Sequence, residues 1–170
     1  YRDTDAEVVS SSRVRERLHD GDLAGANALL GYRYRVEGEI VRGKQLGRTL
    51  GFPTANMALP ENAVLRHGIY AVRFIRADGS IHDGVASFGR RPTVDEDGVA
   101  LLETYVFGLD EEIYGETCTV AVCAFLRGEE KFASLEALSE QMKADEAEAR
   151  AILSALEPLT DLDRKLTFPS

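Results

Sequence analysis

Short runs of β-branched and aromatic residues follow one another through the middle of the chain, with turn residues between them. Runs of this length favour β-strands, and the Asp78-Gly79 and Asp97-Gly98 dipeptides are typical of tight turns between antiparallel strands. No helical periodicity separates the runs, which argues against a doubly wound parallel sheet. We therefore predict an antiparallel sheet or closed barrel, with strands at residues 32–41, 69–75, 81–88, 101–107 and 117–126.

Alternation in the first of these runs predicts which side chains face the core. Tyr32, Tyr34 and Val36 alternate with Arg33 and Arg35, which is the pattern of a half-buried strand with its arginines outward.

Helical patterns lie on both sides of the strands. Ser134 is a suitable N-cap for an amphipathic helix that ends before Pro158, and its apolar stripe is expected to pack on the barrel. Near the start, the serines at 10–12 predict the cap of a short helix, and Asp22 and Gly31 bound a second one. Residues 1–9 show no pattern, and the tail after Pro158 stays unassigned.

Composition limits the classes of function. The 170 residues suffice for one ordinary domain, and the net charge of −9 argues against a nucleic-acid-binding protein. We see no signal peptide and no apolar run long enough for a membrane span, so we expect a cytoplasmic protein. Cys118 and Cys123 lie at an odd separation, so on one strand they face opposite sides and predict no disulfide.

A glycine-rich stretch stands between the first two predicted parts of the sheet. Gly43, Gly47 and Gly51 recur every four residues, which neither a helix nor a central strand favours. Lys44 and Arg48 add positive charge in an otherwise acidic chain. The stretch is suited to bring backbone N–H groups close to a phosphate, although a flexible surface loop explains the composition equally well.

Two oxygen-bearing side chains follow this stretch. Pro53 fixes the backbone, and in an extended segment Thr54 and Asn56 point to the same side. A hydroxyl and an amide carbonyl are hard ligands that suit magnesium or a phosphate. The sequence is not a Walker P-loop, because Gln45 follows Gly43-Lys44 where that motif requires serine or threonine.

Glu103, Arg127 and Phe132 are further candidates. Glu103 shares a strand face with apolar residues, where a carboxylate is costly unless it is paired or used as a general base. Arg127 and Phe132 could hold a flat ring between a guanidinium and an aromatic side chain. Taken alone, these residues favour structural explanations: Glu103 as a rim carboxylate paired with an arginine, Arg127 as a loop arginine and Phe132 as a core phenylalanine.

Together these pieces resemble a known family. The stretch from Gly43 to Asn56, with Gly-Phe-Pro-Thr-Ala-Asn at its end, resembles the signature of riboflavin kinases. The resemblance extends over residues 31–153, with later blocks in the same order: Gly68-Ile69-Tyr70, Arg91-Pro92-Thr93, Glu103, Tyr114-Gly115, Leu126-Arg127 and Ser134-Leu135. Ser87 departs from it, since many members have asparagine there.

The resemblance implies a fold and a reaction. Riboflavin kinases have a six-stranded antiparallel barrel with a C-terminal helix, and they transfer the γ-phosphate of ATP to riboflavin to give FMN. By resemblance, Thr54 and Asn56 hold Mg²⁺ and the ATP phosphates, and the glycine stretch covers the nucleotide. Glu103 accepts the hydroxyl proton, and Arg127 with Phe132 closes over the flavin. A binding module that holds flavin or nucleotide without turnover is the alternative.

The N-terminal residues carry a second resemblance. Ser10-Ser11-Ser12-Arg13-Val14-Arg15 resembles the junction of bacterial bifunctional FAD synthetases, in which an FMN adenylyltransferase domain precedes the kinase. This implies a connector and remnant of that domain at 1–30, a kinase domain at 31–158 and a tail at 159–170. The parent protein is then expected to carry the adenylyltransferase, covalently linked.

Overall fold

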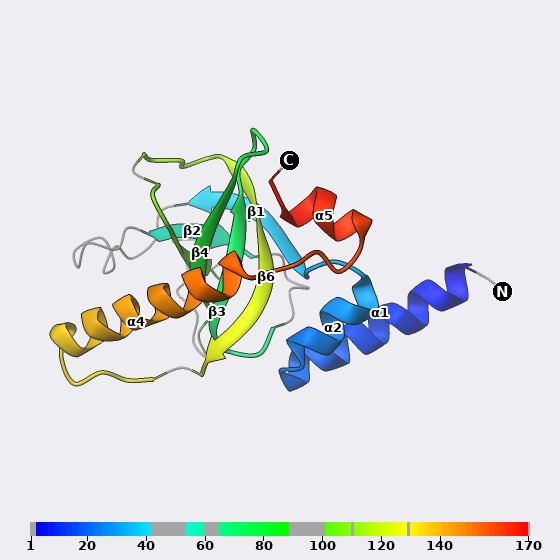
Figure 1. Cartoon of the computed structure of the whole chain (residues 1–170), viewed down its shortest axis with the longest axis horizontal. Helices are drawn as coiled ribbons and strands as arrows, with labels where there is room; N and C mark the ends of the chain where they lie inside the picture. The colour runs from blue at the N-terminus through cyan, green and yellow to red at the C-terminus, as the bar shows by residue number, and fades with distance from the viewer. Residues whose placement is uncertain are drawn as a thin grey trace.

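The computed structural model describes residues 3–41, 54–59, 65–88, 101–109, 111–128 and 130–169, with side chains from residue 12 onward. Its strands close into an antiparallel barrel in the order β1-β2-β5-β4-β3-β6. Figure 1 shows the barrel with the helices around it. The predicted six-stranded barrel is confirmed. The strands are β1 (Arg35–Val41), β2 (Thr54–Ala58), β3 (Gly68–Ile75), β4 (Ile81–Phe88), β5 (Leu101–Val106) and β6 (Thr117–Arg127).

Alternate residues of each strand fill the barrel interior. Val36, Met57, Phe74 and Val120 are among the buried residues of this core, and Phe74 and Val120 are fully buried. The intervening residues point outward, as the period of two requires. The outer face is therefore where the strands can present polar side chains.

Helix α4 (Leu135–Ser154) covers one outer side of the barrel, across β3 and β4 (Figure 1). The Ser134 hydroxyl accepts a hydrogen bond from the N–H of Ala137 at 3.0 Å, so the predicted N-cap is confirmed. Ala149 and Leu153 of α4 pack against Ala71 on β3. Among the helices that the structure describes, none combines the length and apolar character needed to cross a membrane.

Two helices precede the barrel. Helix α2 (Leu23–Leu30) begins after Asp22, which accepts a hydrogen bond from the N–H of Gly25 at 3.0 Å, and it ends at Gly31 with φ of 79°. Both predicted boundaries are confirmed. Helix α1 (Asp3–Asp20), in contrast, begins before the serine run, so the predicted cap at 10–12 was wrong.

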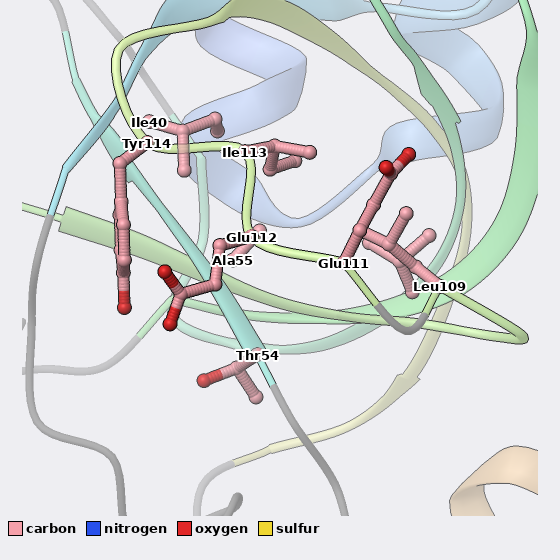
Figure 2. A pocket seen from close by; sticks show the side chains of 9 residues that line it. Ile40, Thr54, Ala55, Leu109, Glu111, Glu112, Ile113 and Tyr114 are labelled. Carbon is pink, nitrogen blue, oxygen red and sulfur yellow. The ribbon is translucent and has the colours of Figure 1, made fainter.

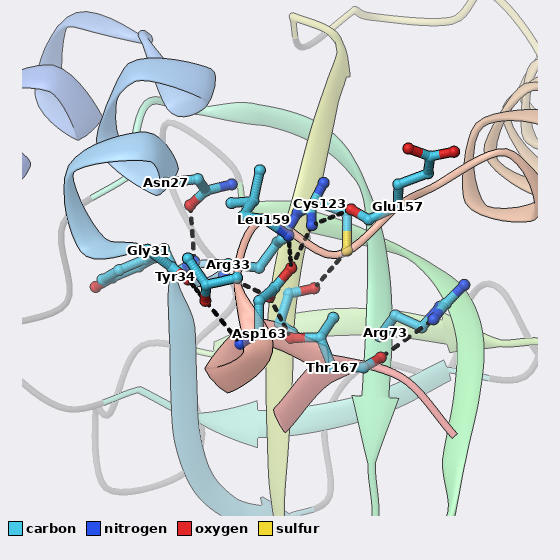
Figure 3. A network of polar contacts seen from close by, with 12 residues as sticks. Asn27, Gly31, Arg33, Tyr34, Arg73, Cys123, Glu157, Leu159, Asp163 and Thr167 are labelled. Carbon is cyan, nitrogen blue, oxygen red and sulfur yellow. Dashed lines mark hydrogen bonds and ion pairs between the residues drawn. The ribbon is translucent and has the colours of Figure 1, made fainter. Parts of the chain in front are cut away.

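The segment after α4 contains a further helix, α5 (Asp161–Thr167), to which the sequence pattern gave no assignment. Asp163 of α5 is completely buried and accepts hydrogen bonds from the N–H and the guanidinium of Arg33 (Figure 3). Arg33 is only 8% exposed, although the alternation puts it on the polar side of the predicted strand, because α5 covers it. Its burial is possible because the carboxylate neutralises the charge.

Candidate active site

One row of residues runs across the outer face of the barrel beside α4. Asn56 on β2 is paired with Glu103 on β5, and Glu103 is paired with Ser87 on β4. Ser87 is paired with Ile69 on β3, and Ile69 with Arg127 on β6. Directly paired residues of antiparallel strands project to the same side, with Cβ atoms about 4.5–5.5 Å apart. The barrel thus brings together three predicted site residues that are far apart in the sequence.

Glu103, the candidate general base, shares this face with the candidate metal ligands Thr54 and Asn56. Thr54 precedes Asn56 by two positions on β2, and it is paired with Tyr105 on β5. The predicted common orientation of Thr54 and Asn56 is therefore confirmed by the strand. Glu103 lies two positions before Tyr105, so hydroxyl, amide and carboxylate oxygens converge on one patch.

Asn56 provides evidence for a ligand at this patch. The residue is 3% exposed, and its Oδ1 atom has no hydrogen-bond partner among the described residues. An unsatisfied buried carbonyl oxygen is costly, and such atoms in native structures call for an explanation. A hard cation would satisfy this oxygen, and the Thr54 hydroxyl is a second oxygen donor of the same class, so the residues present fit Mg²⁺.

A cavity of about 240 Å³ separates the row from helix α4. Apolar side chains from the barrel and the helix form most of its wall, while Glu103 and Arg127 contribute charge from the barrel side. A pocket with apolar walls and a few oriented polar groups is the usual site of a small organic ligand. Its lining residues are Ile69, Val85, Ser87, Glu103, Tyr105, Arg127, Leu138, Met142 and Asp145.

Arg127 is tied to helix α4 at one end of this cavity. Its Nε donates to Oδ1 of Asp145 at 3.0 Å and its Nη2 donates to Oδ2 at 2.9 Å. Gln141 also donates to Oδ1 of Asp145, at 3.0 Å. The guanidinium carbon of Arg127 lies 5.7 Å from the ring centroid of Phe132, so the structure brings together the predicted pair.

Asp145 is a site residue that the sequence interpretation missed. It is 4% exposed, and it lies three positions after Met142 and four before Ala149, on the apolar stripe of α4. A carboxylate within an apolar stripe needs a partner, and that interruption was a signal in the sequence.

Tyr105 fixes the middle of the cavity wall. Its hydroxyl donates to Oε1 of Glu146 on α4 at 3.1 Å, and its ring makes an edge contact with Phe107. Burial raises the pKa of the Tyr105 hydroxyl, and the hydrogen bond and charge of Glu146 raise it further. The tyrosine is therefore a neutral hydrogen-bond donor near pH 7.

Thr54 lines a second, smaller pocket of about 30 Å³ (Figure 2). The segment between β5 and β6 contributes Glu112 and Tyr114, whose polar ends lie on the side of the Thr54 hydroxyl in this view. Ile40 and Ala55 supply apolar walls. Thr54 thus contributes to this pocket, while Glu103 and Arg127 line the cavity beneath α4.

The predicted phosphate-binding stretch cannot be compared with this geometry. Gly43, Lys44, Gly47, Arg48 and Gly51 all lie outside the described residues. The ends of the described chain on either side are Val41 and Thr54.

Comparison with known proteins gives the family. A model of the riboflavin kinase family matches residues 30–153, which is most of the chain. The chain belongs to the riboflavin kinase family. The matched range contains every predicted site residue of the two pockets, whereas α5 lies beyond it.

Curated relatives in the riboflavin kinase family are longer than this chain. The bifunctional riboflavin kinase/FMN adenylyltransferase of Listeria monocytogenes is 39% identical over 153 residues, covering 89% of this chain and 48% of the relative. The protein of the same name from Haemophilus influenzae is 40% identical over 151 residues, covering 89% of this chain and 49% of the relative. The chain spans about half the length of the curated relatives it matches.

Solved structures agree on the riboflavin kinase fold. A Streptococcus pneumoniae protein described as a macrolide-efflux protein is 34% identical, with a TM-score of 0.74 over 84% of this chain and 46% of that one. Riboflavin kinase from Trypanosoma brucei is 22% identical, with a TM-score of 0.54 over 73% of this chain and 79% of that one. The second likeness supports the barrel and its helix only.

Proposed function

We propose that this chain transfers the γ-phosphate of ATP to the ribityl 5′-hydroxyl of riboflavin, giving FMN and ADP. The placement of Glu103 between Asn56 and Ser87 is the single observation that supports this most directly. It puts a candidate base beside candidate metal ligands on one side and beside a ligand-sized cavity on the other. Membership in the riboflavin kinase family supports riboflavin and ATP as the substrates of such a site.

Glu103 is the proposed general base. Its carboxylate accepts the proton of the 5′-hydroxyl, while the hydroxyl oxygen forms a bond to the γ-phosphorus of ATP. The bond between that phosphorus and the bridging oxygen breaks, and ADP leaves with the bonding electron pair. In such a reaction, positioning and charge neutralisation supply most of the rate enhancement.

Thr54 and Asn56 are the proposed ligands of Mg²⁺ and the ATP phosphates. The Oδ1 atom of buried Asn56, which has no hydrogen-bond partner within the described part of the chain, supports this assignment. A bound magnesium ion supplies charge neutralisation on the transferring phosphate. The two side chains would hold the ion at one place on the barrel, because β2, which carries them, is paired with β1 and with β5.

The cavity beneath α4 is the proposed flavin site. Its apolar barrel and helix walls suit a flat aromatic ring, and Arg127 beside Phe132 can cover one end of that ring. Glu103 lines the same cavity. A flavin with its ring beneath α4 could therefore direct its ribityl chain toward the carboxylate and the metal ligands.

The glycine stretch before β2 is proposed to bind the ATP phosphates through backbone N–H groups. Its composition supports this role, and so does its place in the sequence immediately before Thr54. The residues concerned are Gly43, Lys44, Gly47, Arg48 and Gly51.

We further propose that the parent protein joins this kinase to an FMN adenylyltransferase domain and works in the cytoplasm, where ATP is available. The names and lengths of the relatives from Listeria monocytogenes and Haemophilus influenzae support the first part. In such a protein, the FMN made here would be the substrate of the second reaction.

The test is conversion of riboflavin to FMN with Mg-ATP, followed by chromatography, on the unmodified chain, on Glu103→Gln and on Glu136→Gln. Glu136 is an exposed carboxylate at the start of α4 and serves as the matched control. The glutamine in place of Glu103 keeps the shape of the side chain and removes the base. We expect turnover to fall by a factor on the order of 10²–10⁴ in Glu103→Gln and to stay unchanged in Glu136→Gln.

The other outcomes separate the alternatives. Unchanged turnover in Glu103→Gln would keep the kinase and remove the base role from Glu103. Riboflavin binding without turnover in the unmodified chain would favour the non-catalytic binding module. Neither turnover nor binding would overturn the flavin assignment.

A further inference from the structure

A compact ionic cluster lies beyond the end of β3, centred on Arg76, which lines neither pocket. The Nε and Nη2 atoms of Arg76 donate to the two carboxylate oxygens of Glu116, at 3.0 and 2.8 Å. The remaining Nη1 donates to Glu111. The backbone N–H of Ala77 also donates to Glu116, at 3.2 Å. Arg76 thus binds the first and the last residue of the segment 111–116.

The cluster is strongly ionic. The hydrogen bonds from Arg76 lower the pKa of Glu116 to about 2, despite the opposing effect of burial, and the Ala77 N–H adds to the lowering. Glu111 and Glu116 together raise the pKa of Arg76 further above its usual range. Arg76 and Glu116 are therefore oppositely charged near pH 7, and the planar fork of arginine fixes the direction of the pair.

The same segment is fixed at its other side by strand β1. The N–H of Ile40 donates to the carbonyl of Glu116 at 2.9 Å, and the N–H of Gly115 donates to the carbonyl of Ile40 at 2.8 Å. The residues between the two glutamates are thus held between the end of β3 and the end of β1. They include Glu112 and Tyr114, which line the small pocket beside Thr54 (Figure 2).

We infer that Arg76 is a positioning residue for the nucleotide side of the site, because it holds the segment with Glu112 and Tyr114 against Thr54. This inference rests on the proposed function, in which Thr54 binds the ATP phosphates. The nucleotide then occupies the space next to Thr54, and the 111–116 segment forms one of its walls. Arg76 does not line either pocket and acts only through that wall.

The geometry predicts a selective effect. The 111–116 segment lines the small pocket, whereas no residue of it lines the cavity beneath α4. Loosening the segment should therefore weaken nucleotide binding and leave riboflavin binding intact. A purely structural role would lower the thermal stability without distinguishing the two substrates.

The experiment compares Arg76→Gln and Arg76→Lys with Arg17→Gln in the same chain. Arg17 forms an exposed pair with Asp22 at the junction of α1 and α2, so its variant removes a like charge from a residue that lines neither pocket. The measurements are KM for ATP, KM for riboflavin, and the Kd of Mg-ADP by calorimetry, which does not depend on turnover. Melting temperatures are recorded to separate loss of folding from loss of binding.

We expect Arg76→Gln to raise KM for ATP and the Kd of Mg-ADP on the order of tenfold, with KM for riboflavin unchanged. Arg76→Lys retains the charge without the two-pronged geometry, so it should give a smaller increase of the same kind. Arg17→Gln should change none of the three constants.

Equal increases in both KM values, or a lower melting temperature with unchanged constants, would overturn the inference while the kinase assignment stands. If Arg76→Gln does not fold, Arg76→Lys decides by the same constants. If the unmodified chain neither phosphorylates riboflavin nor binds Mg-ADP, the proposed function fails and the inference fails with it.

Discussion

Arg127 on β6 and Asp145 on α4 form a two-pronged ion pair, with nitrogen–oxygen distances of 3.0 and 2.9 Å. Asp145 is almost completely buried, and the Arg127 side chain is 20% exposed. The pair joins the barrel to the helix at the charged end of the cavity. The position of the guanidinium therefore depends on α4 as much as on the strand that carries it.

Replacement of Asp145 by asparagine should weaken flavin binding selectively. Without the second carboxylate oxygen, Arg127 loses one of its two hydrogen-bond acceptors and the negative charge that orients it. We therefore expect KM for riboflavin to rise on the order of tenfold, with KM for ATP unchanged. Glu140→Gln is the control, since Glu140 lies on the same helix and its side chain is 72% exposed. Equal changes in both constants would contradict a role at the flavin end.

Replacement of Asp163 by asparagine should destabilise the fold. The carboxylate is fully buried beside Arg33, and its removal leaves a buried guanidinium without a counter-charge. We expect the free energy of unfolding in urea to fall by about 3–5 kcal/mol. The exposed Asp161 on the same helix provides the control, because Asp161→Asn should cost no more than about 1 kcal/mol. Similar losses in the two variants would contradict the importance of the buried pair.

Stability should decline in acid partly through Glu116. Its folded pKa of about 2 lies below the ordinary value of 4.5, so its contribution is complete above pH 4.5 and is lost as the pH falls toward 2. Urea midpoints measured from pH 7 to pH 2.5 should fall more steeply below pH 4.5 in the unmodified chain than in Glu116→Gln. Parallel curves would show that the Arg76 pair contributes no pH-dependent stability.

Gly38 on β1 should not accept a side chain. A Cβ atom there would lie 2.2 Å from the carbonyl oxygen of Ala58, which is backbone and cannot move aside alone. We expect Gly38→Ala to lower the free energy of unfolding by about 1–3 kcal/mol. Gly128→Ala is the matched control, because a Cβ atom there meets no atom of the described residues within 4 Å. A loss in the control as large as that in Gly38→Ala would contradict the steric explanation.

The local features of the fold could be predicted because each depends on neighbouring residues. The caps at Asp22, Gly31 and Ser134 are short-range hydrogen-bond patterns, and the alternation that places Val36 in the core is set by strand geometry. The predicted start of α1 was wrong, because three serines favour a helix N-cap without requiring one.

Features that depend on distant partners could not be read from the sequence. Helix α5 is seven residues long, and contacts such as the one with Arg33, 130 positions earlier, hold it in place. Glu103 was a candidate from its strand pattern, but its place between Asn56 and Ser87 follows from the strand order of the barrel. The family resemblance implied the role of Glu103, and the register supplies the geometry.

The Arg33–Asp163 contact also sets an order of events during synthesis. All six strands have been made once Arg127 is added, yet the guanidinium of Arg33 then still lacks its carboxylate. Until Asp163 is made, this guanidinium would have to stay in water, and the start of β1 would not be firmly packed. Leu159 and Thr167 then complete the hydrogen bonds of Asp163 (Figure 3). Helix α5 thus completes the packing around Arg33 only after all six strands have been made, and a chain cut before Asp163 would leave that guanidinium without its counter-charge.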